Sequence, residues 1–187
     1  MKKRILFVAM AAIFISVVIS GCASFPEPSE KVRTMLYAAA EYYGSYTYGG
    51  SSEAEVKKLV SGISVKIKDI STKKTYTLVS NAKGEIIRTN LPEGTYIIAE
   101  IASEFEYDGR KWWSNCVPRT NDVSAYFKVR EGVVNLGIIR IDINFDTGSG
   151  RTSWMNSPDS ARQRFETNHS DSWWCIEDWF DMVESRQ

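Results

Sequence analysis

Apolar and polar residues alternate most regularly between residues 62 and 101 of the chain. Ile63, Val65 and Ile67 alternate with polar side chains, which is the pattern of a β-strand with one buried face. Further strands are predicted at 75–79, 86–87 and 95–101, with turns at 81–84 and 91–94. Short strands at this spacing, separated by turns that contain Gly or Pro, predict an antiparallel β-sandwich.

The alternation resumes after a long predicted loop over 104–122. Ala125, Phe127 and Val129 predict one strand, and a turn at 130–132 leads into a second strand over 133–145. Four apolar side chains of that second strand share one face: Ile139, Ile141, Ile143 and Phe145. This run is long enough to close a sheet.

The segment from Val32 to Tyr43 fits two patterns. A helix that begins at Ser29 would place Val32, Met35 and Leu36 on one face. A strand would alternate through Met35 and Tyr37 instead. The strand is favoured because the following segments are strands, and the Gly- and Ser-rich stretch 44–52 after it predicts a loop.

The last forty residues change to a helical pattern. Ser157 followed by Pro158 predicts a helix start, with a capping hydroxyl and a proline in the first turn. Ala161 and Phe165 would then face the sandwich. His169, the only histidine of the chain, is predicted to end this helix. A second helix is predicted after Ser172 because the following apolar residues are spaced three, four and three apart: Trp173, Ile176, Phe180 and Val183. The chain therefore carries a short C-terminal helical appendage.

Residues 62–101 also resemble a known family of domains. Gly84, then a strand, then Leu91-Pro92-Glu93-Gly94-Thr95-Tyr96 is similar to the turn of transthyretin-like β-sandwiches, the carboxypeptidase-regulatory-like and Cna-B-type domains. In those families the tyrosine of this turn enters the core. The resemblance covers about 40 residues and implies a transthyretin-like, Ig-like fold, but such folds carry many functions.

The N-terminus has the composition of an export signal. Three basic residues precede an apolar run from Ile5 to Ser20, and the small residue Gly21 follows. This is the order of a secretory signal peptide. A transmembrane anchor is the alternative, but it needs about 20 apolar residues, and this run has 16.

The four residues Ile19-Ser20-Gly21-Cys22 resemble the lipobox of bacterial lipoproteins. The resemblance implies cleavage before Cys22 and lipidation of its sulfur, so that Cys22 tethers the mature protein to a lipid bilayer in the bacterial cell envelope. Two or more acyl chains hold a protein stably on a membrane. In enterobacterial lipoproteins an Asp after the cysteine favours retention in the inner membrane, so by this resemblance Ala23 favours the outer membrane.

This reading divides the chain into a signal peptide (1–21), a lipidated tether (22–31), a β-sandwich domain (32–146) and the helical appendage (147–187). Two prolines within residues 23–29 predict an extended tether. The mature chain keeps all 23 acidic residues but only 20 of the 23 basic ones, for a net charge of −3. Such a balance argues against nucleic acid as a partner.

Two cysteines remain beside Cys22 in the mature chain. Cys116 and Cys175 form an even pair in an exported protein, which predicts a disulfide. The bridge would close a loop of about 60 residues and stabilise the fold by about 4 kcal/mol. Two buried free thiols are the alternative.

The sequence predicts no catalytic site, no metal site and no cofactor. It has no His-Glu-x-x-His or Cys-x-x-Cys pattern, and Gly148-Ser149-Gly150 lacks the frame of a nucleophile elbow or a phosphate loop. A hydrolase that uses only carboxylates remains open, because acid pairs have no diagnostic spacing.

Trp112 and Trp113 are the candidate ligand contacts. They lie in the predicted long loop, where an indole can stack on a sugar ring or anchor a partner. The alternative is that at least one of them packs beneath the loop. The sequence thus predicts a membrane-anchored, non-catalytic binding or structural module with an envelope protein or glycan as partner. A glycan-binding accessory or an envelope hydrolase is the alternative function.

Overall fold

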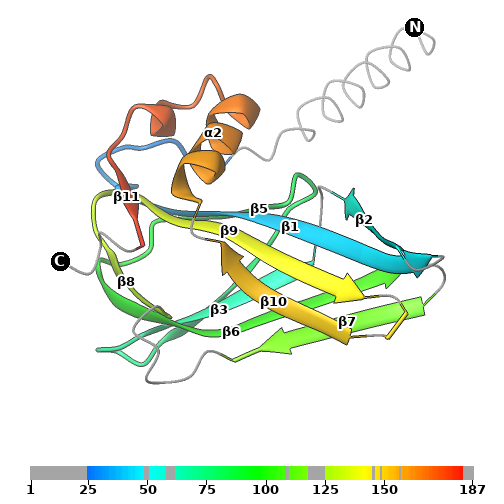
Figure 1. Ribbon diagram of the computed structural model, residues 1–187. Coiled ribbons are helices and arrows are strands. Elements are labelled where there is room, and N and C mark those ends of the chain that lie inside the picture. Colours follow the sequence, from blue (N-terminus) through cyan, green and yellow to red (C-terminus); the bar gives the residue numbers. More distant parts are fainter. Residues whose placement is uncertain are drawn as a thin grey trace, which may run out of the picture.

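In the computed structural model the chain folds into two β-sheets that lie face to face, with a helical layer on the outer face of one of them (Figure 1). The structure describes residues 25–48, 51–57, 62–107, 110–117, 125–144, 146–147, 149–155 and 157–182. The predicted mainly β architecture is confirmed. The tyrosine of the predicted turn, Tyr96, is fully buried, and its hydroxyl donates to the Pro92 carbonyl at 2.8 Å.

The first sheet contains six strands in the order β10-β9-β1-β2, with β5 on β1 and β11 on β9. Their bounds are β1 (Thr34–Tyr48), β2 (Ser51–Lys57), β5 (Glu85–Thr89), β9 (Gly132–Asn144), β10 (Ser149–Met155) and β11 (Trp179–Asp181). The pairs β1–β9 and β9–β11 are parallel. The prediction of a wholly antiparallel sandwich was therefore wrong, because the first long strand and the late strand β9 pair side by side in the same direction.

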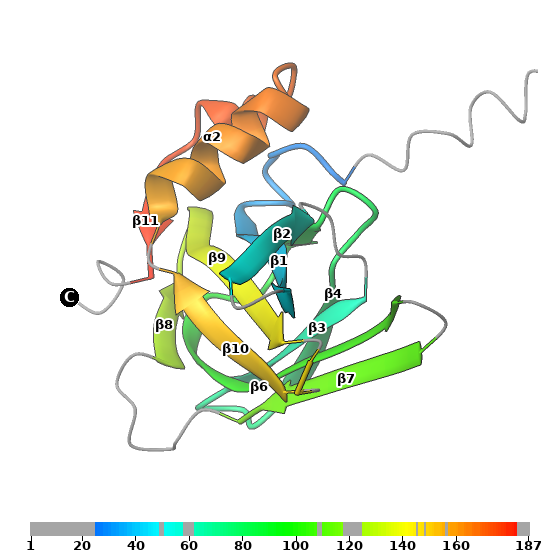
Figure 2. The same ribbon diagram turned by 45° about the vertical axis from the view of Figure 1, so that its right-hand side comes forward.

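The second sheet contains five strands in the order β4-β3-β6-β7, with β8 on β6. Their bounds are β3 (Ile63–Asp69), β4 (Thr75–Val79), β6 (Gly94–Tyr107), β7 (Arg110–Cys116) and β8 (Tyr126–Val129). Figure 2 shows this sheet packed across the first one. Between β4 and β5 the chain passes from the second sheet to the first through the predicted turn, where Gly84 takes a left-handed φ of 68°.

Strand β1 settles the ambiguity of residues 32–43. All six residues from Met35 to Ala40 are fully buried. Leu36, Ala38 and Ala40 point between the sheets, whereas Met35 and Tyr37 point to the outer face. A strand covered on both faces reads as a continuous apolar run, and this is why its sequence also fitted a helix.

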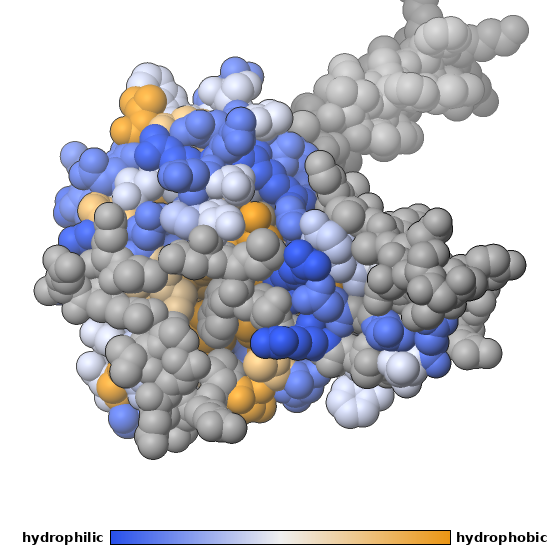
Figure 3. All heavy atoms as spheres, viewed as in Figure 1, coloured by the Kyte–Doolittle hydropathy of each residue, from blue (hydrophilic) through white to orange (hydrophobic). Residues whose placement is uncertain are grey.

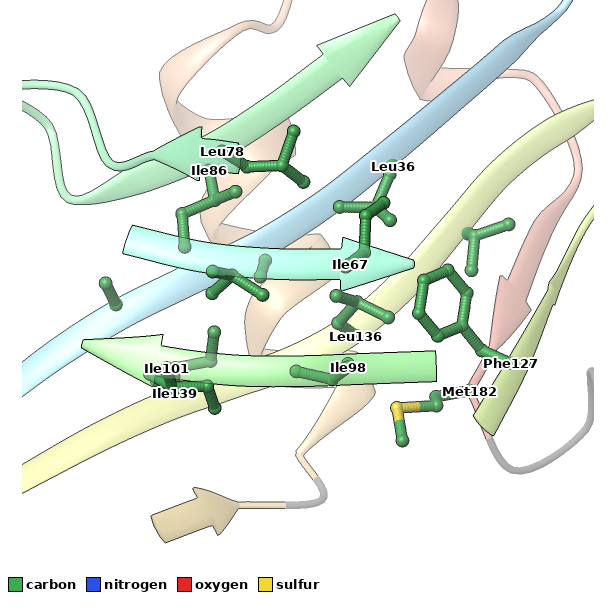
Figure 4. Close-up of a cluster of buried hydrophobic side chains, with 14 of the residues drawn as sticks. Leu36, Ile67, Leu78, Ile86, Ile98, Ile101, Phe127, Leu136, Ile139 and Met182 are labelled. Atoms are coloured by element: carbon green, nitrogen blue, oxygen red, sulfur yellow. The ribbon is translucent and has the colours of Figure 1, made fainter. Parts of the chain in front are cut away.

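The sandwich core lies between the two sheets and is built from alternate residues of their strands (Figure 4). It includes Leu36, Ile67, Ile98, Phe127 and Ile139. Of the four residues predicted to share a face on the long closing strand, Ile139 and Ile141 are in this core. The side chain of Ile143 and the whole of Phe145 lie outside the described residues.

The helical layer covers the outer face of the first sheet. Helix α2 (Pro158–Asn168) begins after Ser157 as predicted, and Ala161 and Phe165 are fully buried against the sheet. The capping hydrogen bond expected from the Ser157 hydroxyl is not formed, so Pro158 in the first turn is the local signal that holds. The predicted second helix was wrong: residues 173–175 form a short 3₁₀ turn, η2 (Trp173–Cys175), and residues 179–181 form strand β11. Residues 179–181 extend the sheet beside β9, and their backbone bonds there replace those of a helix.

Three predicted loops or boundaries also need correction. The stretches 44–52 and 104–122 are largely the strands of two hairpins, β1–β2 and β6–β7. Strand β10 pairs with β9, so residues 149–155 belong to the sheet and not to the predicted appendage that starts at 147. In each case the segment has mixed polarity, and backbone pairing with a neighbouring strand decides its structure.

Candidate functional site

The N-terminal segment from Phe25 to Ser29 is bound to the helical layer. The Phe25 ring packs 5.7 Å from the Phe165 ring and 5.0 Å from the His169 ring, between centroids. The Pro26 carbonyl accepts a hydrogen bond from the buried Trp174 indole at 2.9 Å. Residues 25–29 were predicted to be a free extended tether, and the structure shows instead that they form part of the fold.

The carboxylate of Glu27 joins this segment to the η2 turn. It accepts hydrogen bonds from the Ser172 hydroxyl at 2.8 Å and from the Trp173 backbone N–H at 3.0 Å. Ser172 also caps the turn by accepting from the Trp174 N–H. An acceptor at the start of a helical turn satisfies backbone donors that have no partner within the turn. The N-terminal segment and the turn therefore hold each other in place.

A second set of polar contacts, which we call the Glu85 clamp, ties the end of α2 to the sheet. Glu85 lies at the start of β5 and its side chain is fully buried. Its carboxylate accepts from Asn168 at 2.8 Å, from His169 Nε2 at 3.0 Å and from Asn81 at 3.2 Å. An ionised carboxylate only accepts hydrogen bonds, so His169 carries a proton on Nε2.

The clamp keeps Glu85 ionised. Burial by itself raises the pKa of this carboxyl, but the hydrogen bonds from Asn168, His169 and Asn81 outweigh burial and lower the pKa below its ordinary value. The same carboxylate acts on its neighbour Tyr37: burial first, and then the charge of Glu85, raise the pKa of the Tyr37 phenol. The hydrogen bonds of the clamp thus offset the cost of burying the charge of Glu85.

The histidine and the cysteine of this region do not form a nucleophilic pair. The Cys175 thiol donates to the backbone carbonyl of His169 at 3.2 Å, whereas the imidazole Nε2 is bonded to Glu85. Burial, followed by the charges of Glu166 and Glu27, raises the pKa of the Cys175 thiol. A nucleophilic cysteine needs a lowered pKa. His169 also ends α2, as predicted, through its backbone N–H to the Phe165 carbonyl.

An open depression of 610 Å³ lies beside the clamp between α2 and the β4–β5 turn. Its charged side chains bond to the protein itself. Arg164 donates to the Lys83 carbonyl at 2.7 Å and lies 3.8 Å from the Glu41 carboxylate. Lys83 donates to the Asn168 carbonyl at 3.3 Å. These contacts join α2 to the sheet and leave no set of polar groups converging on a ligand among the lining residues.

The structure brings none of the predicted site residues together. Cys22 lies outside the described residues. Cys116 and Cys175 are both free thiols, contrary to the predicted disulfide. Cys116 ends β7 in the second sheet, whereas Cys175 packs in the helical layer beyond the first sheet, so the sandwich separates the two residues.

Trp112 and Trp113 lie on strand β7 and not in a loop. Trp113 pairs with Glu104 of β6, and its side chain is 82% exposed. Trp112 pairs with Phe105, and its side chain lies outside the described residues.

Sequence reasoning missed Glu27 and Glu85. Each is a single carboxylate beside a turn, and its partners lie far along the chain: residues 172–173 for Glu27, and residues 168–169 for Glu85. The pattern Asn81-x-x-x-Glu85 gave a local signal, since Asn81 closes the turn by accepting from two backbone N–H groups. Nothing local indicated the contact with α2.

In the described part of the chain, no cluster of three or more His, Cys, Asp or Glu side chains has the arrangement of a metal site. No helix among the described residues is long and apolar enough to cross a membrane. Comparison of the chain with protein-family models and with curated proteins finds no match.

Proposed function

We propose that this chain is a bacterial lipoprotein, held in the cell envelope by acyl chains on Cys22, whose sandwich serves as a non-catalytic binding or structural module. The observation that carries the proposal is Ile19-Ser20-Gly21-Cys22 at the end of a basic and then apolar N-terminus. The packing of residues 25–29 adds a consequence, because only Ala23 and Ser24 separate Cys22 from Phe25. The domain would then sit directly at the bilayer surface. Ala23 favours the outer membrane.

A transthyretin-like fold is part of this proposal. The two-layer architecture supports it, as does Tyr96, which is buried after the Leu91–Gly94 turn and bonded back to that turn. The parallel pairing of β1 with β9 is a departure from the antiparallel sandwich that the resemblance implies.

The non-catalytic part of the proposal is supported by the state of the two most reactive side chains in the helical layer. The His169 imidazole is committed to the buried Glu85 and lies against two phenylalanine rings. The Cys175 thiol has a raised pKa and a backbone partner. Both groups stabilise the fold in these positions. Partners would be envelope proteins or glycans, and the charge of −3 argues against nucleic acid.

The lipid anchor is tested by membrane fractionation and mass spectrometry of the full chain expressed in a bacterial host. We expect the wild type in the membrane fraction, with acyl groups on Cys22 as the first residue. The Cys22→Ser variant, exported behind an ordinary cleavable signal, should be folded and soluble. Cys116→Ser is the matched control and should stay in the membrane. A Cys22→Ser protein that remains membrane-bound after signal removal would show that the anchor assignment is wrong.

Glycan binding is a second candidate because Trp113 exposes 82% of its side chain on β7. An exposed indole can stack on a sugar ring. We expect a glycan array to identify a ligand whose binding weakens about fivefold or more in Trp113→Ala, since loss of an aromatic contact costs about 1 kcal/mol or more. Trp173→Ala, which removes an indole from the helical layer, should bind normally. Absence of any bound glycan would reject this candidate.

A further inference from the structure

We propose that Trp173 and Ile176 enter the headgroup region of the bilayer that holds Cys22, so that the η2 turn fixes which face of the domain meets the membrane. This inference rests on the proposed lipid anchor and adds a second, non-covalent contact to it. Its basis is an exposed apolar pair on a turn that the N-terminal segment holds in place.

Both side chains are unusually exposed for their type. Trp173 is 65% exposed and Ile176 is 74% exposed, although the indole between them in sequence, Trp174, is fully buried. The Ile176 N–H donates to the Trp173 carbonyl at 3.2 Å, so the two residues belong to the same turn. In Figure 3 an apolar patch stands out among hydrophilic side chains over the helical layer. Neither side chain belongs to the hydrophobic clusters of the described residues.

The η2 turn is also joined by a hydrogen bond to the N-terminal segment that leads to Cys22. Glu27 accepts from the Trp173 N–H, and Glu27 is five residues from Cys22. Five residues span at most about 18 Å, and the three from Cys22 to Phe25 span at most about 11 Å. The other well-exposed apolar side chains of the described residues lie in the second sheet or at its strand ends: Val79, Trp113 and Val117. The turn is therefore the contact that a lipidated Cys22 would bring to the membrane.

The chemistry of the pair fits the membrane interface. Tryptophan is enriched at the headgroup level because its ring is apolar and its N–H is polar. Acidic residues flank the turn, namely Asp171, Glu177 and Asp178. Their charges keep the insertion shallow and disfavour an anionic lipid surface. We therefore assign zwitterionic lipid as the occupant, with the acyl chains of Cys22 supplying the affinity and the turn supplying the orientation.

The test uses the lipidated full-length mature protein in phosphatidylcholine vesicles, with and without bromine near the headgroup end of the acyl chains. Bromine quenches tryptophan fluorescence at short range. With one of six tryptophans at the interface, we expect the wild type to lose up to about one sixth of its emission. Trp173→Phe should abolish most of this loss and keep the backbone bond to Glu27. Ile176→Ser, which retains the indole, should reduce it about twofold or more.

Trp113→Phe is the matched control, because it removes an indole of similar exposure from the second sheet. It should leave the quenched emission unchanged. Acylated protein that shows no quenching, or that loses its quenching in Trp113→Phe, would overturn the inference and leave the lipid anchor intact. Mass spectrometry of the same samples separates this case from failure of the anchor: a Cys22 without acyl groups would overturn both proposals.

Discussion

Replacement of Glu85 by glutamine removes the charge of the clamp with almost no change in side-chain shape. The carboxylate now accepts three hydrogen bonds in a fully buried position. The glutamine oxygen can still accept from Asn168. Its NH₂ group, however, would face the Asn81 amide and the His169 N–H, which are themselves donors. The hydrogen bonds from Asn81 and His169 to a charged oxygen are therefore lost.

The expected loss of stability follows from these bonds. A hydrogen bond to a charged group contributes about 1.5–3 kcal/mol. Loss of two gives about 3–6 kcal/mol. Asn81 is exposed and can turn toward water, so the lower end applies. We expect Glu85→Gln to reduce the free energy of unfolding by about 3 kcal/mol at pH 7, and the melting temperature of a domain of this size by about 6–12 °C.

The pH dependence gives a second, independent signature. Because the pKa of Glu85 is lowered in the folded state, its ionised form stabilises the fold above the unfolded pKa, and this contribution is lost as the pH falls through the folded pKa. Glutamine does not titrate. The difference in stability between the wild type and Glu85→Gln should therefore shrink as the pH falls below about 4.

Urea unfolding of the mature domain with Cys22 replaced by serine, followed by tryptophan fluorescence at several pH values, measures both effects. Glu93→Gln is the matched control, because Glu93 is exposed in the Leu91–Gly94 turn; surface changes of this kind alter stability by less than about 0.5 kcal/mol. A Glu85→Gln protein as stable as this control at pH 7, or a stability difference that does not shrink in acid, would refute the clamp.

Three further predictions follow from the fold. Gly132→Ala should lower the free energy of unfolding by about 2–4 kcal/mol, measured by thermal unfolding. Gly132 has a φ of 103°, and an added Cβ would lie 2.5 Å from the Asp178 carbonyl oxygen. An unchanged melting temperature would contradict this close contact. Tyr96→Phe should cost about 1 kcal/mol through its lost hydrogen bond to the turn, and a neutral result would show that this bond is dispensable. When the denatured, unreduced protein is treated with an alkylating reagent, mass spectrometry should find both Cys116 and Cys175 modified. Two unmodified cysteines would support the predicted disulfide instead.

The sequence predicted most strands of the second sheet because each of them has one clear inner face. The strand predicted at 75–79 coincides with β4, and the alternation of Ile63, Val65 and Ile67 marks the buried side of β3. The pattern was less informative for the first sheet. Strand β1 is buried on both faces, so its residues no longer alternate in polarity. The length and pairing of hairpins such as β1–β2 depend on partners that no local pattern specifies.

The helical layer also shows that local sequence patterns predict an element only where no distant strand pairs with it. The start of α2 has a local cause, Ser157 followed by Pro158, and was predicted. Residues 173–183 have helical spacing, but the backbone of residues 179–181 pairs with β9. The predicted disulfide was wrong for a related reason. An even number of cysteines indicates an oxidising compartment, but it does not show whether the two residues lie close together, and here the sandwich lies between the two thiols.

The packing of Phe25 against the helical layer changes what a lipid on Cys22 would do. A free tether would let the domain rotate above the membrane, so any face of it could meet a partner. In this fold the Phe25 ring is held between Phe165 and His169, and Glu27 is bonded to the η2 turn. The chain that leads to Cys22 thus leaves from the helical layer with two intervening residues. Under the proposed anchor, the second sheet, with the exposed Trp113 on β7, points away from the bilayer and is the surface available to a partner.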